Sequence, residues 1–549
     1  MNRMLPMLTL AAGLLLTAAA QAAAPGITGP TFDLTAAPAY ISQPDGQSVY
    51  SWGYGCNTQP SGFVPTAITA PTSGCPTMQI PGPTLVVTEG QTVSVTLHNG
   101  LPASAGNTSI LFPGFTLTSC AGAQGLLTCE ATPGGTVTYT FTASSPGTRA
   151  YYSGTQSDLQ VEMGLYGAII VLPLSPPTVC GTLGGISSTA NDGLPVTHPG
   201  GNKQARAAWG ENDFRLAPAA YDHPDTCYDR EYLFQFSEMD PNVHIQALAQ
   251  VNTCAAPGAP AGCHLNVPTE PYHPVYYMIN GRSMPDNMDP NYAAQYPHQP
   301  YNGNPHMHPG ELTLLRIIGT GRWQHPFHEH GNHVRILARD GNLITADSTV
   351  PANNILYPGA AAAVPALAGP LLFTTTTTPG LAMDGIFYWS GKGLNWDAYG
   401  HNPASAATAA MPVHATCTPD ANGYNTSAPT AINYFEWCQD HNKPLQAKPF
   451  GDVAAGGPVT LPDPNLFTNG AWFGGSPYLG PDATVRATGP TGTTPPSGTI
   501  ANPPTSEAGF AFMWHSHNER EITTNNIFPG GMLMMMLVDS REFVIDESN

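Results

Sequence analysis

The segment TLVVTEGQTVSVTLHN, residues 84–99, alternates apolar and polar side chains on both sides of Glu89-Gly90. A period of two is typical of a β-strand with one buried face, and Glu-Gly suits the turn between two such strands. The segment TVTYTFTA (136–143) alternates in the same way, and GLYGAIIVLP (164–173) indicates a buried strand. Short strands separated by turn residues predict a β-sandwich over residues 30–173.

The second half of the chain repeats this character. Residues 205–549 are expected to form a second sandwich, reached through a Gly/Ser/Pro-rich linker at 174–204. Its expected strands and turns lie in DREYLFQFSEM (229–239), GELTLLRIIGTGRWQHPFHEHGNHVRILARDG (310–341), GLAMDGIFYWSGKG (380–393), GFAFMWHSHNE (509–519) and GGMLMMMLV (530–538).

Three stretches of this half need separate interpretation. Residues 395–505 are rich in Pro, Gly, Asn and Thr, and we interpret them as an insertion at the rim of the second sandwich. Residues 240–310 are interpreted as loop-rich. The run from Met532 to Met536 predicts a strand with core side chains in preference to a methionine copper site.

Composition agrees with β-structure and limits the binding partners. The 549 residues include 58 glycines and 57 prolines, and only 10% are charged, which favours strands joined by long loops. The net charge of −20 argues against nucleic acid and against anionic membranes as partners.

The N-terminus, MNRMLPMLTLAAGLLLTAAAQAAAPG, has an early Arg, a short apolar run and small residues near Ala22. This pattern predicts a signal peptide over residues 1–22, with a retained anchor as the alternative. No further candidate membrane span follows. We therefore expect a secreted protein, located in the periplasm, the cell envelope or outside the cell.

Ten cysteines in an exported chain predict disulfides. They fall into pairs that are close in sequence, and we expect each cysteine to bond to its neighbour. The pairs are Cys56/Cys75, Cys120/Cys129, Cys180/Cys227, Cys254/Cys263 and Cys417/Cys438.

Histidines cluster in two segments, HPFHEHGNH (325–333) and WHSHNERE (514–521). His515 and His517 are two positions apart, so on a strand their side chains point the same way. Imidazole is a common ligand of copper, zinc, nickel and iron, so the segments predict a metal site. A buried histidine network satisfied by backbone groups is the alternative.

Several segments resemble multicopper oxidases, which are built from cupredoxin domains. PGPTLVVTEGQTVSVTLHN (81–99), PGTRAYYSG (146–154) and MGLYGAIIV (163–171) resemble the first cupredoxin domain of that family. HPFHEHG matches the third copper motif, and His515-Ser516-His517 resembles the fourth, which reads His-Cys-His. The resemblance implies tandem Greek-key cupredoxin-like sandwiches.

The resemblance also assigns ligands. It implies that His325 occupies a type 1 (blue) copper position, His328 a type 2 position and His330 a type 3 position. His515 and His517 fall at type 3 positions, whereas Ser516 and Glu521 replace the type 1 cysteine and second type 1 histidine. The family's Gly-Met pair comes late, at Gly531-Met532, so the resemblance does not assign the axial ligand.

The first sandwich departs further from the family. The His-Trp-His-Gly and Tyr-His-Ser-His motifs are replaced by Leu111-Phe112-Pro113-Gly114 and Tyr151-Tyr152-Ser153-Gly154. The four histidine positions therefore hold Leu111, Pro113, Tyr152 and Gly154, none of which offers an imidazole. Without them, and without a thiolate at Ser516, ordinary laccase chemistry is not expected.

The remaining metal candidates are His325, His328, His330, His515, His517 and Glu521. Neutral imidazoles suit copper or zinc, whereas added carboxylate would favour manganese or iron. We expect one or two copper ions and a metal-dependent oxidoreductase acting on a small molecule or a metal ion. The alternative is a non-catalytic metal-binding or structural envelope protein.

Three other interpretations remain open. His306-Met307-His308 could bind copper, although such histidines are usually just solvated. Gly509, His515, His517 and Glu521 also fit the first metal motif of cupins, but no companion motif follows. A third, middle cupredoxin domain would have only about 130 residues between the first sandwich and position 305.

Overall fold

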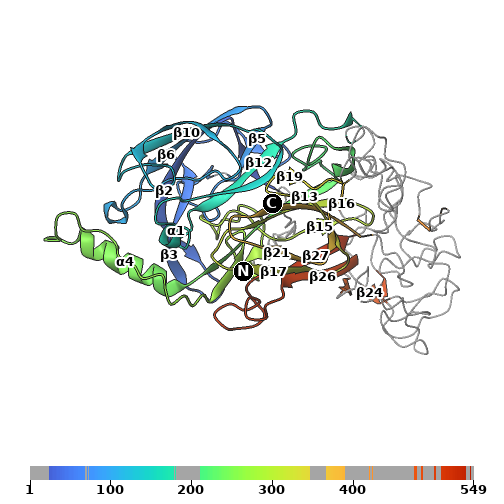
Figure 1. The fold of residues 1–549 in the computed structure, drawn as a ribbon. Helices are drawn as coiled ribbons and strands as arrows, with labels where there is room; N and C mark the ends of the chain where they lie inside the picture. Colours follow the sequence, from blue (N-terminus) through green and yellow to red (C-terminus); the bar gives the residue numbers. More distant parts are fainter. Residues whose placement is uncertain are drawn as a thin grey trace, which may run out of the picture.

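The computed structural model contains two β-sandwiches, one from each half of the chain, which lie side by side (Figure 1). The predicted all-β class with tandem cupredoxin-like sandwiches is confirmed. The described residues are 24–68, 71, 73–178, 180, 211–346, 367–389, 420, 423–424, 475–478, 484–485, 500–501, 509–539 and 544–545.

Two five-stranded sheets form the first sandwich, in the orders β11-β12-β5-β1-β4 and β3-β2-β6-β10-β7. Their strands are β1 (Gly26–Thr28), β2 (Thr31–Ser42), β3 (Ser48–Cys56), β4 (Phe63–Val64), β5 (Leu85–Thr88), β6 (Thr92–Asn99), β7 (Leu117–Ala121), β10 (Thr136–Thr142), β11 (Gly147–Tyr152) and β12 (Tyr166–Leu172). This half also contains the 3-10 helix η1 (Ala103–Ala105), the hairpin of β8 (Ala123–Gln124) and β9 (Cys129–Glu130), and the single turn α1 (Ser157–Gln160).

The alternation of residues 84–99 produces β5, a turn and β6. Val93, Val95 and Leu97 of β6 are buried in the core, as the pattern predicts. Gly90 in the turn has a φ of +82°, a conformation that costs a glycine little. The predicted strands at 136–143 and 164–173 appear as β10 and β12.

The second sandwich has a sheet with the path β14-β13-β16-β22-β18-β19, on which β20 also pairs with β18, and a sheet ordered β15-β27-β26-β17-β21, on which β23 pairs with β26. The strands are β13 (Arg230–Met239), β14 (Tyr276–Ile279), β15 (His306–Met307), β16 (Leu312–Gly319), β17 (His325–Glu329), β18 (Val334–Arg339), β19 (Asn342–Leu343), β20 (Leu371–Leu372), β21 (Thr374–Thr377), β22 (Ala382–Tyr388), β23 (Gly475–Tyr478), β26 (Gly509–Ser516) and β27 (Leu533–Asp539). A separate pair comprises β24 (Thr484–Val485) and β25 (Ile500–Ala501).

Aromatic and methionine side chains fill the core between these two sheets. Phe236, Phe327 and Trp514 are fully buried there. The alternate methionines Met532, Met534 and Met536 pack against the same cluster. The interpretation of the methionine run as a strand with core side chains is thus confirmed.

An arginine is buried where the two sandwiches meet. Arg316 on β16 pairs with Glu231 of β13, with 2.8 Å between Nε and Oε2. It also donates to the hydroxyl of Thr148 on β11 (3.0 Å) and lies 3.6 Å from a carboxylate oxygen of Asp384 on β22. Thr148 donates in turn to Asp384 (2.6 Å). These contacts tie the first sandwich to the second through compensated charges.

Within the segment interpreted as loop-rich, α4 (Pro241–Ala255) is a 15-residue helix. Asp240 caps it by accepting a hydrogen bond from the Asn242 amide (2.9 Å), and Pro241 occupies its first turn, where no intrahelical amide bond is lost. That Asp-Pro start was a signal for a helix that the sequence interpretation passed over.

Four predicted disulfides are present: Cys56–Cys75, Cys120–Cys129, Cys180–Cys227 and Cys254–Cys263. The fifth predicted pair, Cys417/Cys438, lies outside the described residues, as do the predicted signal peptide and most of the 174–204 linker and the 395–505 insertion. Among the helices that the structure describes, none has both the length and the apolar character needed to cross a bilayer.

Candidate metal centre

Two neighbouring strands carry the clustered histidines. β17 pairs antiparallel with β26, so that His328 lies opposite His515 and Phe327 lies opposite Ser516. Because side chains alternate along a strand, Phe327 and Ser516 point into the sandwich while His328 and His515 share the other face. This register brings the two histidine segments, about 190 positions apart in the chain, to one place.

Four of the predicted residues converge there: His328, His330, His515 and His517, called the four-histidine cluster below. Ring centroids lie 4.8 Å apart for His328 and His330, 4.9 Å for His328 and His517, and 5.1 Å for His330 and His515. The Nε2 atoms of His330 and His515 are 3.2 Å apart. Two nitrogens bound about 2.0–2.1 Å from one tetrahedral ion are separated by about 3.3 Å, so this spacing fits two ligands of a single metal.

The protonation of these rings suits metal binding. Burial and, after it, the charges of its three histidine neighbours together lower the pKa of His328 to about 3. Burial also lowers the pKa of His515. His515 Nδ1 lies 2.7 Å from the Ser516 carbonyl, which can only accept, so the proton sits on Nδ1 and the lone pair of Nε2 faces His330. The hydroxyl of Thr374 orients His328 through its Nδ1 (2.6 Å).

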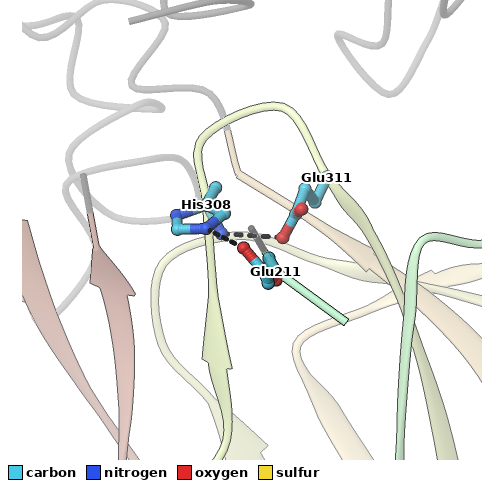
Figure 2. A group of neighbouring side chains, drawn as sticks. All are labelled: Glu211, His308 and Glu311. Carbon is cyan, nitrogen blue, oxygen red and sulfur yellow. Dashed lines mark hydrogen bonds and ion pairs between the residues drawn. The ribbon is translucent and has the colours of Figure 1, made fainter. Parts of the chain in front are cut away.

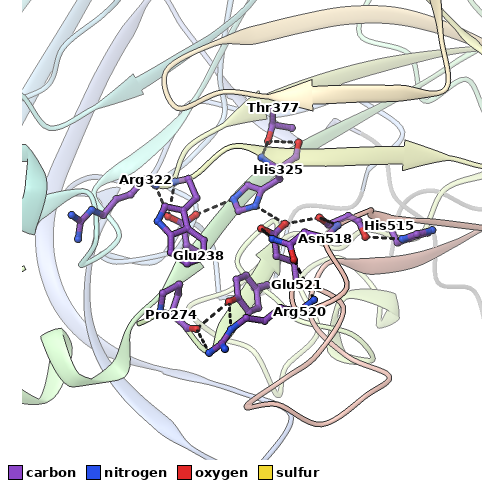
Figure 3. Close-up of polar contacts among 12 residues, drawn as sticks. Glu238, Pro274, Arg322, His325, Thr377, His515, Asn518, Arg520 and Glu521 are labelled. Atoms are coloured by element: carbon purple, nitrogen blue, oxygen red, sulfur yellow. Dashed lines mark hydrogen bonds and ion pairs between the residues drawn. The ribbon is translucent and has the colours of Figure 1, made fainter. Parts of the chain in front are cut away.

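His325 and Glu521, which Figure 3 labels, form a different group with Ser516 on the inner side of the strands. His325 Nδ1 is 2.9 Å from Glu521, and its Nε2 is 2.9 Å from Glu238. Ser516 donates its hydroxyl to the same Glu521 oxygen. Two predicted ligands, His325 and Glu521, are therefore held by each other and by Glu238, apart from the four-histidine cluster.

The two carboxylates set the charge of His325. Burial lowers the pKa of this imidazole, but the hydrogen bonds and charges of Glu238 and Glu521 outweigh burial and raise the pKa to about 9. At neutral pH His325 is then an imidazolium, which has no lone pair for a metal.

The polar contacts continue towards the first sandwich. Glu238 accepts hydrogen bonds from the Arg322 and Trp323 amides (2.6 and 2.9 Å). Tyr272 donates to Glu162 of the first half (2.6 Å), and its hydroxyl lies 3.5 Å from Glu238. Sequence reasoning missed Glu238 as a site residue, although a carboxylate at the end of the apolar run YLFQFSEM was a signal of a buried polar partner.

The first sandwich offers no imidazole at the positions where the resemblance implied metal ligands. Leu111 and Tyr152 exchange backbone hydrogen bonds of 2.7 and 3.3 Å, which places the two altered motifs side by side. The Leu111 side chain packs onto Gly154: a β-carbon there would lie 2.8 Å from Leu111 Cγ. Side-chain packing therefore occupies this position.

His308 joins a second group of metal-ligand types with Glu211 and Glu311 (Figure 2). Their donor atoms all lie within 4.8 Å of one another, and all three residues are buried. Arg230, however, pairs with both glutamates, and both ring nitrogens of His308 face oxygen acceptors. Arg230 supplies positive charge to both glutamates here, so the group resembles a compensated ion-pair network more than a metal site.

The ion pairs of His325 predict how stability varies with pH. An imidazole whose pKa rises from 6.5 unfolded to about 9 folded stabilises the protein fully below pH 6.5 and loses that contribution as the pH rises through 9. The loss is about 3 kcal/mol by linkage. The Glu238→Gln variant should show a smaller loss across this window in denaturant titrations.

The comparison isolates His325 when both proteins carry Glu162→Gln, because the charge of Glu238 also contributes to the raised pKa of Glu162. Burial raises the pKa of Glu329 to about 8, so this carboxyl titrates in the window in either protein. Equal pH dependence with and without Glu238→Gln in that background would contradict the assignment.

Residues 75–176 match the model of the family described as multicopper oxidase. The resemblance to that family is thus confirmed over this part of the chain. No curated protein matches the sequence.

Solved structures are also similar to this chain. The blue copper oxidase from Nitrosomonas europaea is 14% identical, with 92% of this chain and 85% of that chain covered and a TM-score of 0.41. The multicopper oxidase mgLAC is 13% identical, with coverage of 92% and 86% and a TM-score of 0.40. The copper nitrite reductase from Nitrosomonas europaea is 17% identical, with coverage of 66% and 85% and a TM-score of 0.35. At these TM-scores the similarities carry no inference about function.

Proposed function

We propose that this protein is a multicopper-oxidase-like metal protein that holds one copper ion in the four-histidine cluster and has no type 1 copper. The spacing of 3.2 Å between the Nε2 atoms of His330 and His515 carries the proposal, because two imidazole nitrogens at this distance fit two ligands of one ion. His328 and His517 complete the donor set from the same face.

The donor set favours particular metals. Neutral imidazoles suit copper and zinc, whereas manganese and iron(II) favour sites with carboxylate oxygens. Glu521 is engaged by His325 and Ser516 on the inner side of the strands. Glu519 lies 3.5 Å from His517 but is largely exposed. We therefore rank copper first and zinc second.

The chain's own residues define what the site can do. Copper, when bound, would supply one-electron redox chemistry. Ser516 and Thr374 fix the orientation of the His515 and His328 rings. The exposed side of His517 leaves the cluster open to a small molecule, such as a phenol, or to a metal ion as substrate. With the predicted signal peptide, this gives a secreted or periplasmic metal-dependent oxidoreductase.

A second candidate function is metal binding without catalysis, in the cell envelope. It is favoured by the first sandwich, where Leu111 packs on Gly154 and the altered motifs themselves contain no histidine. Metal analysis of purified protein, followed by oxygen uptake with a phenolic reductant, separates the two. Copper-dependent oxygen uptake supports the oxidoreductase, bound copper without uptake supports the second candidate, and absence of bound copper or zinc contradicts both.

The copper-loaded protein is expected to show no intense blue absorption. That band requires a thiolate ligand, and Ser516 occupies the cysteine position with its hydroxyl donated to Glu521. The measurement is a visible spectrum of protein titrated with Cu(II), with a blue copper protein at equal copper concentration as reference. An intense thiolate-to-copper band would show that a cysteine reaches the metal.

A further inference from the structure

Four buried side chains form a continuous hydrogen-bonded row inside the second sandwich. Ser516 donates to Glu521, and His325 lies between Glu521 and Glu238 at 2.9 Å from each. None of the four exposes more than 3% of its surface. Glu238 belongs to β13 in one sheet, whereas His325 and Ser516 belong to β17 and β26 in the other. The row therefore links the two sheets across the core, as Figure 3 shows for its labelled members.

A type 1 copper does not fit these residues. The two ring nitrogens of His325 diverge, and each faces a different carboxylate. One ion therefore cannot bind His325 together with both Glu238 and Glu521. The position also lacks a thiolate, because Ser516 replaces cysteine, and a neutral hydroxyl is a weak copper ligand.

Glu521 forms hydrogen bonds with the residues at the end of β26 and just after it, on either side of His517. Besides Ser516 it accepts a hydrogen bond from the Asn518 side chain (2.9 Å), and the Asn518 amide donates to the Ser516 hydroxyl (3.2 Å). The His517 amide donates to the carbonyl of Pro326, the residue after His325 (2.8 Å). The Ser516–Glu521 end of the row and the residue after His325 are thus both connected to the backbone that carries His517.

We propose that the Glu238–His325–Glu521 row is a positioning device that takes the structural place of a metal at this position and sets His515 and His517 for the ion of the four-histidine cluster. The proposal rests on the proposed function for that ion. The imidazolium cross-links the two sheets by opposite charges, as a cation ligated from both sides would. Outer groups that orient metal ligands typically contribute about 10–100-fold to metal affinity.

The first test removes one charge at a time and measures affinity for Zn(II), a probe without redox chemistry. Glu521→Gln and Glu238→Gln are each expected to weaken Zn(II) binding by about tenfold or more while the number of ions per chain stays the same. Glu270→Gln is the matched control, because it changes an exposed carboxylate paired with Arg322. Ile336→Ala is the stability control, because it opens the same core away from the row.

The expected pattern is weaker binding in the two row variants and wild-type affinity in both controls. A fall in melting temperature alone, as in Ile336→Ala, then cannot explain the change. Unchanged affinity in both row variants would overturn the positioning role and leave the proposed metal site intact.

The second test needs no variant that might fail to fold. In metal-free protein with ¹⁵N-labelled histidine, both ring nitrogens of His325 are expected to carry protons at neutral pH. Adding Zn(II) should change the ring signals of the four-histidine cluster and leave those of His325 in place. A neutral or zinc-bound His325 would overturn the inference, whereas zinc that disturbs none of the histidine rings would contradict the proposed function instead.

Discussion

Replacing His328 and His517 together by alanine should reduce bound copper to background. The two rings lie 4.9 Å apart, and removal of both leaves only His330 and His515 at the cluster. Two imidazoles open to solvent bind a metal far more weakly than four that converge. The measurement is copper per chain by elemental analysis after loading and dialysis, with circular dichroism to check the fold.

The matched control removes two histidines elsewhere. The His98 side chain on β6 is 36% exposed, and His264 is exposed beyond α4, so His98→Ala with His264→Ala should keep wild-type copper content. Unchanged copper in the His328/His517 variant would show that the ion binds at another place.

Replacing Arg316 by methionine is expected to destabilise the protein by about 3–5 kcal/mol, because the buried Glu231 and Asp384 would lose their positive partner. Unfolding in denaturant, followed by fluorescence, measures the shift in midpoint. A methionine retains much of the arginine's apolar volume, so the uncompensated charge rather than a cavity dominates the loss.

Two further variants sharpen this result. Glu270→Gln removes only the exposed carboxylate of the ion pair with Arg322 and should cost about 0–1 kcal/mol. Adding Glu231→Gln and Asp384→Asn to Arg316→Met should recover part of the stability, because no buried charge then lacks a partner. A midpoint for Arg316→Met equal to that of Glu270→Gln would contradict the role assigned to the buried network.

The sequence revealed those parts of the fold that depend on neighbouring residues. The alternation in 84–99 identified β5, β6 and the turn at Gly90, because the period of a strand is visible in a single segment. The helix α4 was missed because its Asp-Pro start lies among turn-forming residues. Its burial depends on contacts with the first sandwich, made by Val243 and Ala247, which no local pattern shows.

The same distinction between local patterns and distant contacts applies to the candidate site. His515 and His517 could be assigned to one face because they are two positions apart on a strand. The contact of His325 with Glu238, 87 positions away, depends on how β13 and β17 lie across the core, so the sequence could not indicate it. His325 and Glu521 therefore appeared in one ligand set with the other histidines, whereas the structure separates them.

The packing of Leu111 on Gly154 limits which single substitutions could place histidines at these two positions. The β-carbon of a histidine at position 154 would lie 2.8 Å from Leu111 Cγ. Non-bonded carbon atoms are most stable about 3.5–4.0 Å apart, so the two atoms would overlap. Gly154→His thus requires a change at position 111 first. Leu111→His alone, on the other hand, would give up a packed leucine for one imidazole without a companion. Neither single substitution therefore creates a pair of histidine ligands. Restoring histidines at both positions would require two changes, and the first of them alone gains no metal site.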